Sequence, residues 1–369
     1  MARLAAETRA RDPRRPVIQG EALPGNAWAD YGEALGAMNT LRGESEAIAA
    51  FARGAEWPSR GRVRELLRTH AGLLECLRRG ARREEGAYPY DWTGSPDVET
   101  PDHCSAWRLV EFAAGRARLL MEEGRSTDAI PLLMDTCQFA RDLTQNGGLV
   151  AAAHGTGLFQ RPIVILRELV AQGSMEKEDF LEIDRCLRVF DAGLPDRRQF
   201  WSNQTANYGT ALLSTDRLGE VAWAPGWRHL FSPGVADVDA FEWIDRAGAL
   251  ASRWPGMSWA DVEESAARFL DRAEARGCPI GRRYLRETLG SDQESSWRVI
   301  VANLRMIRMA ARYRATGEFL KLEDPFGESL LHARSGDSVR LWSLGENGRD
   351  DGGKGELWAG EDLVLEVPR

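Results

Sequence analysis

Apolar residues recur every three or four positions along most of this chain, and this pattern stops after Gly317. In residues 27–38, for example, Trp28, Tyr31 and Leu35 fall on one side of a helical wheel. A chain that repeats this period must bury its helix faces against one another. The sequence therefore predicts a mainly α fold.

Changes in composition divide the chain into three parts. Residues 1–25 are polar and contain prolines, and they are predicted to form an extended lead-in. Residues 26–320 carry the helical period and are predicted to form a multi-helix body. Residues 321–369 are predicted to form a small β and loop module, with the boundary near Leu320.

The clearest helical pair lies in residues 105–144. A helix is predicted from Ser105 to Glu123, a turn at Gly124, and a second helix from Asp128 to Thr144. Small residues where the helices would touch loosely resemble one tetratricopeptide-type αα-hairpin, although no second copy follows. The next helix, residues 147–171, is apolar nearly all round, and Pro162 is expected to kink it or to begin a new helix.

Residues 214–260 differ from the rest of the body because they are rich in tryptophan and proline. They are predicted to form a loop-dominated insertion with one short helix near residues 238–253. Their rings either line a groove for a ligand or partner or fill the gap beside the helical body. Acidic residues between the rings argue against single-stranded nucleic acid. The candidate groove residues are Trp223, Trp227, Trp243, Trp254 and Trp259.

Alternating apolar residues replace the helical period beyond residue 320. Short β-type runs are predicted at residues 330–333, 339–344 and 363–367, with a hairpin turn between the first two. Three strands of this length form a small C-terminal β appendage. A loop rich in Gly, Asp, Asn and Glu separates the second strand from the third.

This C-terminal segment resembles that of the major pseudopilins of type II secretion. The resemblance covers roughly the last 45 residues and rests on two motifs. The rest of the chain does not match that family. The motifs are Asp324-Pro-Phe-Gly327 and Leu341-Trp-Ser-Leu-Gly-Glu-Asn-Gly-Arg-Asp-Asp-Gly-Gly353. The prepilin cleavage motif and the long apolar N-terminal helix of that family are absent from this sequence, so pilus assembly is not implied. The chain is also similar to uncharacterised helical bacterial proteins, which implies no activity.

The resemblance implies a calcium ion in the C-terminal loop. It places the backbone oxygen of Leu344, the side chain of Asn347 and the carboxylate of Asp362 at ligand positions. Asn347 stands where the family usually has Asp, which removes one charge, and Asp350 and Asp351 are expected to compensate. The alternative is a metal-free polar loop that is closed by hydrogen bonds.

Composition excludes several classes of partner and site. A net charge of −8 gives no electrostatic reason to expect nucleic acid. The five cysteines are widely spaced without a CxxC pair, so neither a disulfide framework nor a zinc knuckle is predicted. We expect no transmembrane segment. The compartment stays open between the cytoplasm and, if an N-terminal anchor has been removed, the cell envelope.

No catalytic constellation is predicted. Asp102, His103 and Cys104 with Glu111 are the best metal or nucleophile candidates, but Asp102 is better explained as a helix N-cap. His154-Gly-Thr-Gly157 lacks the lysine of a phosphate loop. The sequence favours a non-enzymatic interaction or scaffold protein with a protein partner. The alternative is an enzyme with a site between the helical body and the Trp-rich insertion.

Overall fold

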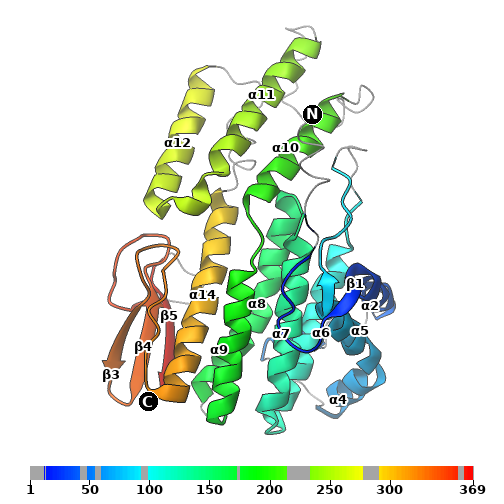
Figure 1. Cartoon of the computed structure of the whole chain (residues 1–369), viewed down its shortest axis with the longest axis vertical. Helices are drawn as coiled ribbons and strands as arrows, with labels where there is room; N and C mark the ends of the chain where they lie inside the picture. Colours follow the sequence, from blue (N-terminus) through cyan, green and yellow to red (C-terminus); the bar gives the residue numbers. More distant parts are fainter. Residues whose placement is uncertain are drawn as a thin grey trace.

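The computed structural model describes residues 12, 14–41, 48–54, 60–92, 99–172, 175–213, 233–276, 291–355 and 361–368. Helices make up most of these residues, and a small three-stranded sheet lies near the C-terminus (Figure 1). The predicted fold class, mainly α with a β appendage, is therefore confirmed.

The helical body is built around long helices that pack side by side. Helix α8 contacts α7 on one side and α14 on the other, and α9 packs against α14 (Figure 1). The body helices are α2 (Trp28–Thr40), α4 (Arg60–Thr69), α5 (Ala71–Ala81), α6 (His103–Glu122), α7 (Ser126–Thr144), α8 (Leu149–Gln172), α9 (Lys177–Ala192) and α14 (Ser291–Thr316).

The predicted αα-hairpin is α6 and α7. Its turn contains Gly124, which has a φ of +72°, a left-handed conformation that glycine adopts without strain. At the start of α6, the side chain of Asp102 accepts a hydrogen bond from the Ser105 N–H, as expected for an N-cap. The hairpin continues directly into α8, which packs against both of its helices.

Helix α8 corrects one expectation. It runs without a break from Leu149 to Gln172, so Pro162 lies inside it and does not begin a new helix. By length and composition alone, α8 could also cross a membrane, and 56% of its most apolar window is buried in the structure. Its apolar surface is explained by its position between α7 and α14.

A group of helices extends the body at one end, which is the top in Figure 1. It consists of α10 (Arg198–Leu213), α11 (Pro233–Ala251), the short 3₁₀-helix η1 (Trp254–Gly256) and α12 (Trp259–Ala275). The segment predicted to be dominated by loops therefore contains a helix, α11, that is longer than expected. Residues 214–232 lie outside the described residues.

The lead-in is held against the body by a short parallel pair of strands. Strand β1 (Leu23–Asn26) pairs with β2 (Arg83–Glu85), and Arg14 forms an isolated bridge with Glu85. Although β1 begins inside the predicted extended segment, its pairing fixes that segment beside α2 and α5 (Figure 1).

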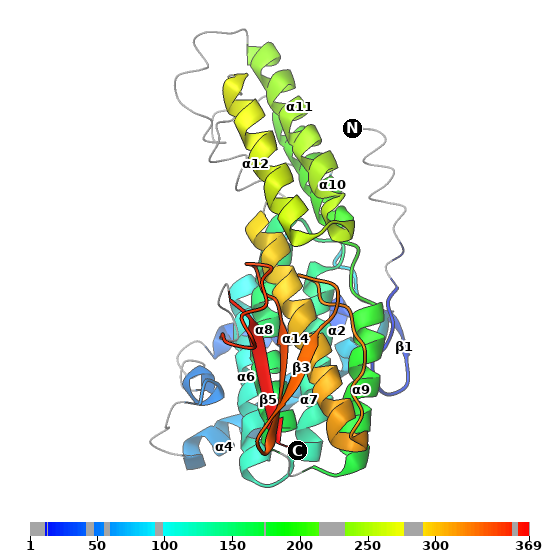
Figure 2. The ribbon, with the colours of Figure 1, turned by 90° about the vertical axis from the view of Figure 1, so that its left-hand side faces the viewer.

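The C-terminal sheet has the order β3-β4-β5 and is antiparallel throughout. The strands are β3 (Leu331–Ser335), β4 (Ser338–Ser343) and β5 (Leu363–Pro368). Figure 2 shows the sheet lying against α14 and α8, and β5 contacts both helices. Alternate strand residues, including Leu341 and Leu365, belong to the same hydrophobic core as the helices. The appendage thus shares the core of the body.

Candidate functional site

The Asp-Pro-Phe-Gly turn fixes the beginning of the C-terminal loop. One oxygen of Asp324 accepts hydrogen bonds from the Phe326 N–H at 3.0 Å and the Ser343 hydroxyl at 2.7 Å. The other oxygen accepts from the Leu344 N–H at 2.9 Å. The carboxylate is 3% exposed, so these three donors replace its water. The turn and the end of β4 are therefore one hydrogen-bonded unit.

The loop after Leu344 depends on glycines that have positive φ. Gly345 has a φ of +63°, and a Cβ there would lie 2.0 Å from the carbonyl oxygen of Glu361. The two ends of the loop therefore touch at this point, and only glycine fits without displacing backbone. Gly348, Gly352 and Gly353 also have positive φ.

The predicted calcium ligands form two separate sets of contacts. Asn347 donates to Asp351 at 2.7 Å, and Asp350 accepts from the Trp342 indole N–H at 3.1 Å. Asp362 accepts from the Gly353 N–H at 2.8 Å. Among the described residues, no three His, Cys, Asp or Glu side chains surround a common point where a metal could sit. Residues 356–360 of the loop lie outside the described part.

Asp362 is fully buried, and its Oδ1 has no hydrogen-bond donor among the described residues. Burial raises the pKa of Asp362, and the nearby charges of Asp351 and Asp350 raise it further. A buried carboxylate oxygen without a donor suits a hard cation such as calcium, but the carboxylates of Asp350 and Asp351 do not converge with it on one point in the described residues.

The tryptophans that were candidates for a groove are found mainly in the core. Trp243, Trp254 and Trp259 are between 0% and 7% exposed. Trp254 packs edge-on against Trp201, and Trp259 packs edge-on against Phe326 of the Asp-Pro-Phe-Gly turn. These three rings fill space between elements rather than line an open groove. Trp223 and Trp227 lie outside the described residues.

A pocket of about 830 Å³ lies where the body, the α11–α12 connection and the C-terminal turn meet. We call it the junction pocket, and its lining includes Arg197, Trp297, Arg298, Asp324 and Leu344. Arg298 forms an ion pair with Glu294 at 2.9 Å. Its remaining donors bind three backbone carbonyls, those of Trp254, Met257 and Pro325. Arg298 therefore joins three segments of the chain.

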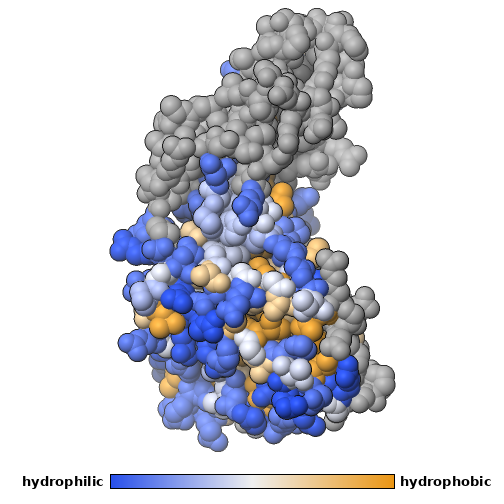
Figure 3. Space-filling model, turned by 90° about the vertical axis from the view of Figure 1, so that its right-hand side faces the viewer, coloured by the Kyte–Doolittle hydropathy of each residue, from blue (hydrophilic) through white to orange (hydrophobic). Residues whose placement is uncertain are grey.

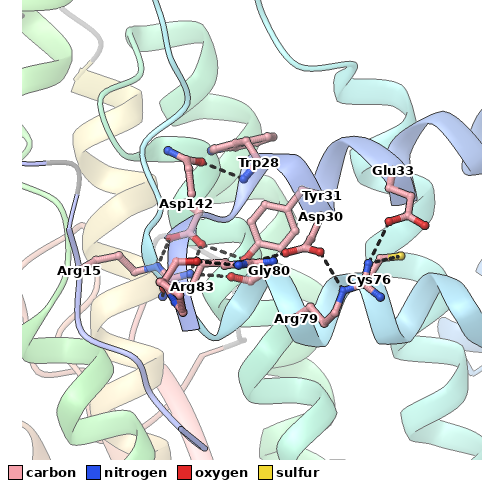
Figure 4. A network of polar contacts seen from close by, with 12 residues as sticks. Arg15, Trp28, Asp30, Tyr31, Glu33, Cys76, Arg79, Gly80, Arg83 and Asp142 are labelled. Atoms are coloured by element: carbon pink, nitrogen blue, oxygen red, sulfur yellow. Dashed lines mark hydrogen bonds and ion pairs between the residues drawn. The ribbon is translucent and has the colours of Figure 1, made fainter. Parts of the chain in front are cut away.

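A second buried polar group joins the lead-in to α2, α5 and α7 (Figure 4). Arg15 and Asp142 form a bidentate ion pair with both contacts at 2.8 Å, and both side chains are fully buried. The Tyr31 hydroxyl donates to the same carboxylate at 2.9 Å. Arg15 also donates to the carbonyls of Gly80 and Arg83. We call these residues the Asp142 cluster.

The sequence analysis did not find the Asp142 cluster. Its two charged members are 127 positions apart, and no motif links them. A signal was present in α7, where Arg141 and Asp142 interrupt a helix whose other neighbours are nearly all buried. Buried charges on a core helix require partners, and this rule could have marked both residues.

The candidate metal or nucleophile group around His103 is not assembled as a site. The rings of His103 and His154 stack at 4.1 Å between centroids, which prevents their nitrogens from converging on one ion. Burial and His154 lower the pKa of His103 to about 4. Glu111 pairs with Arg161 at 2.7 Å, and Cys104 is exposed.

Comparisons of this chain with protein-family models, with curated proteins and with solved structures gave no match.

Proposed function

We propose that this protein is a non-enzymatic helical interaction or scaffold protein whose C-terminal module is stabilised by a bound calcium ion. The observation that carries the proposal is the Oδ1 atom of Asp362, which is buried without a donor. A cation there would satisfy this oxygen and neutralise the repulsion between Asp362 and its two acidic neighbours.

The composition of the loop supports calcium rather than a transition metal. The carboxylates whose charges act on Asp362 are those of Asp350 and Asp351, and calcium prefers six to eight oxygen ligands. Glycines at 345, 348, 352 and 353 have the freedom to turn carbonyl oxygens inward. Calcium would then join the end of β4 to the start of β5 and hold the sheet on α14.

The expected affinity also supports an envelope location. Asn347 supplies no charge, so the site is weaker than one with a further carboxylate. Modules of this kind fill at about 10⁻⁴ to 10⁻³ M calcium, concentrations that occur outside the cytoplasm.

An interaction role is supported by the surface in Figure 3. An apolar area occupies part of the lower half of this face, and hydrophilic residues border it where the neighbouring surface is coloured. Areas of this kind often mark contacts with other proteins.

The alternative proposal, an enzyme that uses the junction pocket, is less well supported. Arg298 and Asp324 are buried there, but each is fully engaged in bonds to backbone and neighbouring side chains. Arg197 pairs with Glu294, and Arg305 pairs with Asp191. Groups committed in this way favour a structural role over proton transfer or nucleophilic attack.

The test of the proposal is calcium titration of metal-free protein, followed by calorimetry and thermal unfolding. We expect heat of binding and a rise in Tm at millimolar calcium. Asp362→Asn should remove both effects, and Asp337→Asn, an exposed change of the same charge in the β3–β4 turn, should keep them. Absence of heat and of a Tm shift in the unaltered protein would contradict the proposal.

A further inference from the structure

A second pocket, of about 420 Å³, shares Leu194 and Pro195 with the junction pocket, and nothing in the proposed function uses it. It is formed by the loop after β2, the end of α7 and the connection between α9 and α10. We call it the Arg141 pocket. Its lining includes Tyr88, Tyr90, Arg141, Asn146, Leu194 and Gln199.

Arg141 is a buried cation that the nearby Asp142 attracts but that forms no hydrogen bond through its guanidinium among the described residues. Its side chain lines the pocket, and the residue is only 4% exposed. No hydrogen bond or ion pair involves its guanidinium among the described residues, and its Nε is enclosed without an acceptor. Burial lowers the pKa of Arg141 to about 10, so it still carries its charge at neutral pH. A buried charge of this kind is costly unless an anion meets it.

The neighbouring carboxylate does not serve this purpose. Asp142 is next to Arg141 in α7, but both of its oxygens bind Arg15, and one also accepts from Tyr31. Arg15 and Arg141 therefore lie beside a single carboxylate, Asp142, whose hydrogen bonds go to Arg15 and Tyr31. The charge of Arg141 remains, and Arg141 lines the pocket.

Tyr90, which also lines the pocket, supplies a second donor. It is 8% exposed, and its hydroxyl has no hydrogen-bond partner among the described residues. Tyr90 is held between Tyr88 at 4.7 Å and Trp92 at 4.9 Å, measured between ring centroids. The stack keeps the hydroxyl in place, so a ligand would meet a wall that is already ordered.

The floor of the pocket is also fixed. Asn146 has a φ of +60°, the one positive value at a non-glycine among the described residues. Its carbonyl accepts from the Trp92 indole at 3.0 Å and from the Asn203 amide at 2.8 Å. Backbone held in a sparsely populated conformation often occurs at binding sites.

We propose that the Arg141 pocket binds a small molecule with an anionic head group, a carboxylate or a phosphate, that Arg141 and Tyr90 hold. A planar anion would accept two parallel bonds from the guanidinium and one from the hydroxyl. The volume limits the rest of the ligand to a small body, which would lie along the ring of Tyr88.

Calorimetric titrations with sodium phosphate and sodium succinate test the proposal, with sodium chloride of equal ionic strength as the reference. We expect at least one of the two anions to bind below about 10 mM. Binding of phosphate alone assigns the site to phosphates, and binding of succinate alone assigns it to carboxylates. Binding of both assigns it to anionic head groups in general. Binding of neither overturns the proposal.

Two variants locate the binding. Arg141→Met should weaken it by about 30-fold or more, because a buried anion would lose its counter-charge. Tyr90→Phe keeps the ring stack and should weaken it about 3- to 10-fold. Arg272→Met, an equal change of charge at an exposed position of α12, should leave it unaltered. If both variants bind the anion as tightly as the unaltered protein does, the proposal is also overturned. Tyr90→Phe removes no charge, so it remains informative if Arg141→Met fails to fold.

Discussion

Two arginines, Arg298 and Arg141, are each 4% exposed and line two neighbouring pockets, and their surroundings differ completely. Arg298 is paired with Glu294 and donates to three carbonyls from two other segments. Arg141 has no acceptor among the described residues. Leu194 and Pro195, in the connection between α9 and α10, line both pockets.

Burial alone does not show whether an arginine has a structural role or a binding role, but the number of acceptors around its guanidinium does. A buried arginine whose donors are all used holds segments together, and its removal leaves orphaned carbonyls. A buried arginine without acceptors contributes nothing to the fold and costs desolvation. Such a residue is better explained by something that it binds.

The largest expected effect comes from Asp142→Asn, which would make Arg15 resemble Arg141. Arg15 and Arg141 would then both be buried without the negative charge of Asp142, and the free energy of unfolding should fall by about 5 kcal/mol. Chemical denaturation measures the change. Asp128→Asn on the same helix, where Asp128 pairs with Arg125 at the exposed surface, should cost less than about 1 kcal/mol. Adding Arg141→Met to Asp142→Asn should restore part of the loss.

Arg298→Met tests the comparison directly. Three carbonyls would lose their donor, and we expect a cost of about 3 kcal/mol. Arg141→Met should be neutral or stabilising in the same denaturation experiment. The control is Arg246→Met, because Arg246 is half exposed and its contacts, an ion pair with Glu242 and the ring of Trp243, lie within α11. Equal losses in Arg298→Met and Arg141→Met would break the comparison.

Asp135 sharpens the comparison by showing a buried carboxylate that lacks a close arginine. It is 2% exposed, accepts from Gln19 at 2.7 Å, and has Arg78 no nearer than 4.0 Å. Burial raises the pKa of Asp135 to about 7. The folded state therefore binds the proton more tightly than the unfolded state, and this group's contribution to stability falls as pH rises from about 4 to 7.

Asp135→Asn keeps an acceptor for Gln19 and removes this titration. At pH 8 the variant should be more stable than the unaltered protein by about 2 kcal/mol, and at pH 4 the two should be alike. Urea unfolding at several pH values measures the difference. A constant difference across this range would show that Asp135 does not titrate in it.

The smallest effect concerns the floor of the Arg141 pocket. Asn146→Ala and Asn146→Gly both remove the side chain, so their difference reports the cost of the positive φ. We expect the alanine variant to be less stable than the glycine variant by about 1 kcal/mol, measured by thermal unfolding. Equal stabilities would mean that the backbone there relaxes easily.

The sequence predicted the elements well because their signals are local. The period of three to four residues gave the α6–α7 hairpin, and Asp102 gave its N-cap. Alternation gave the three C-terminal strands. The helix around Pro162 was predicted, but the sequence left open whether a new helix begins there, and packing on both sides outweighs the loss of one backbone bond.

The sites were harder to predict because they depend on long-range contacts. The loop motif indicated Asp362, but only the structure shows that one of its oxygens lacks a donor. Arg15 and Asp142 meet because β1 pairs with β2 and brings the lead-in against α7. No local sequence pattern predicts the contact between Arg15 and Asp142. Because this contact uses both oxygens of Asp142, the lack of an acceptor for Arg141 could not be predicted from the sequence either.

Strand β5 closes the core from a late point in the chain. Arg167, in the middle of α8, donates to the carbonyl of Val364, which lies 197 positions further on. During synthesis, the sides of α8 and α14 that β5 covers stay open to water until this strand has left the ribosome. The side of α8 at Arg167 must therefore be kept from neighbouring chains while the 197 positions up to Val364 are added.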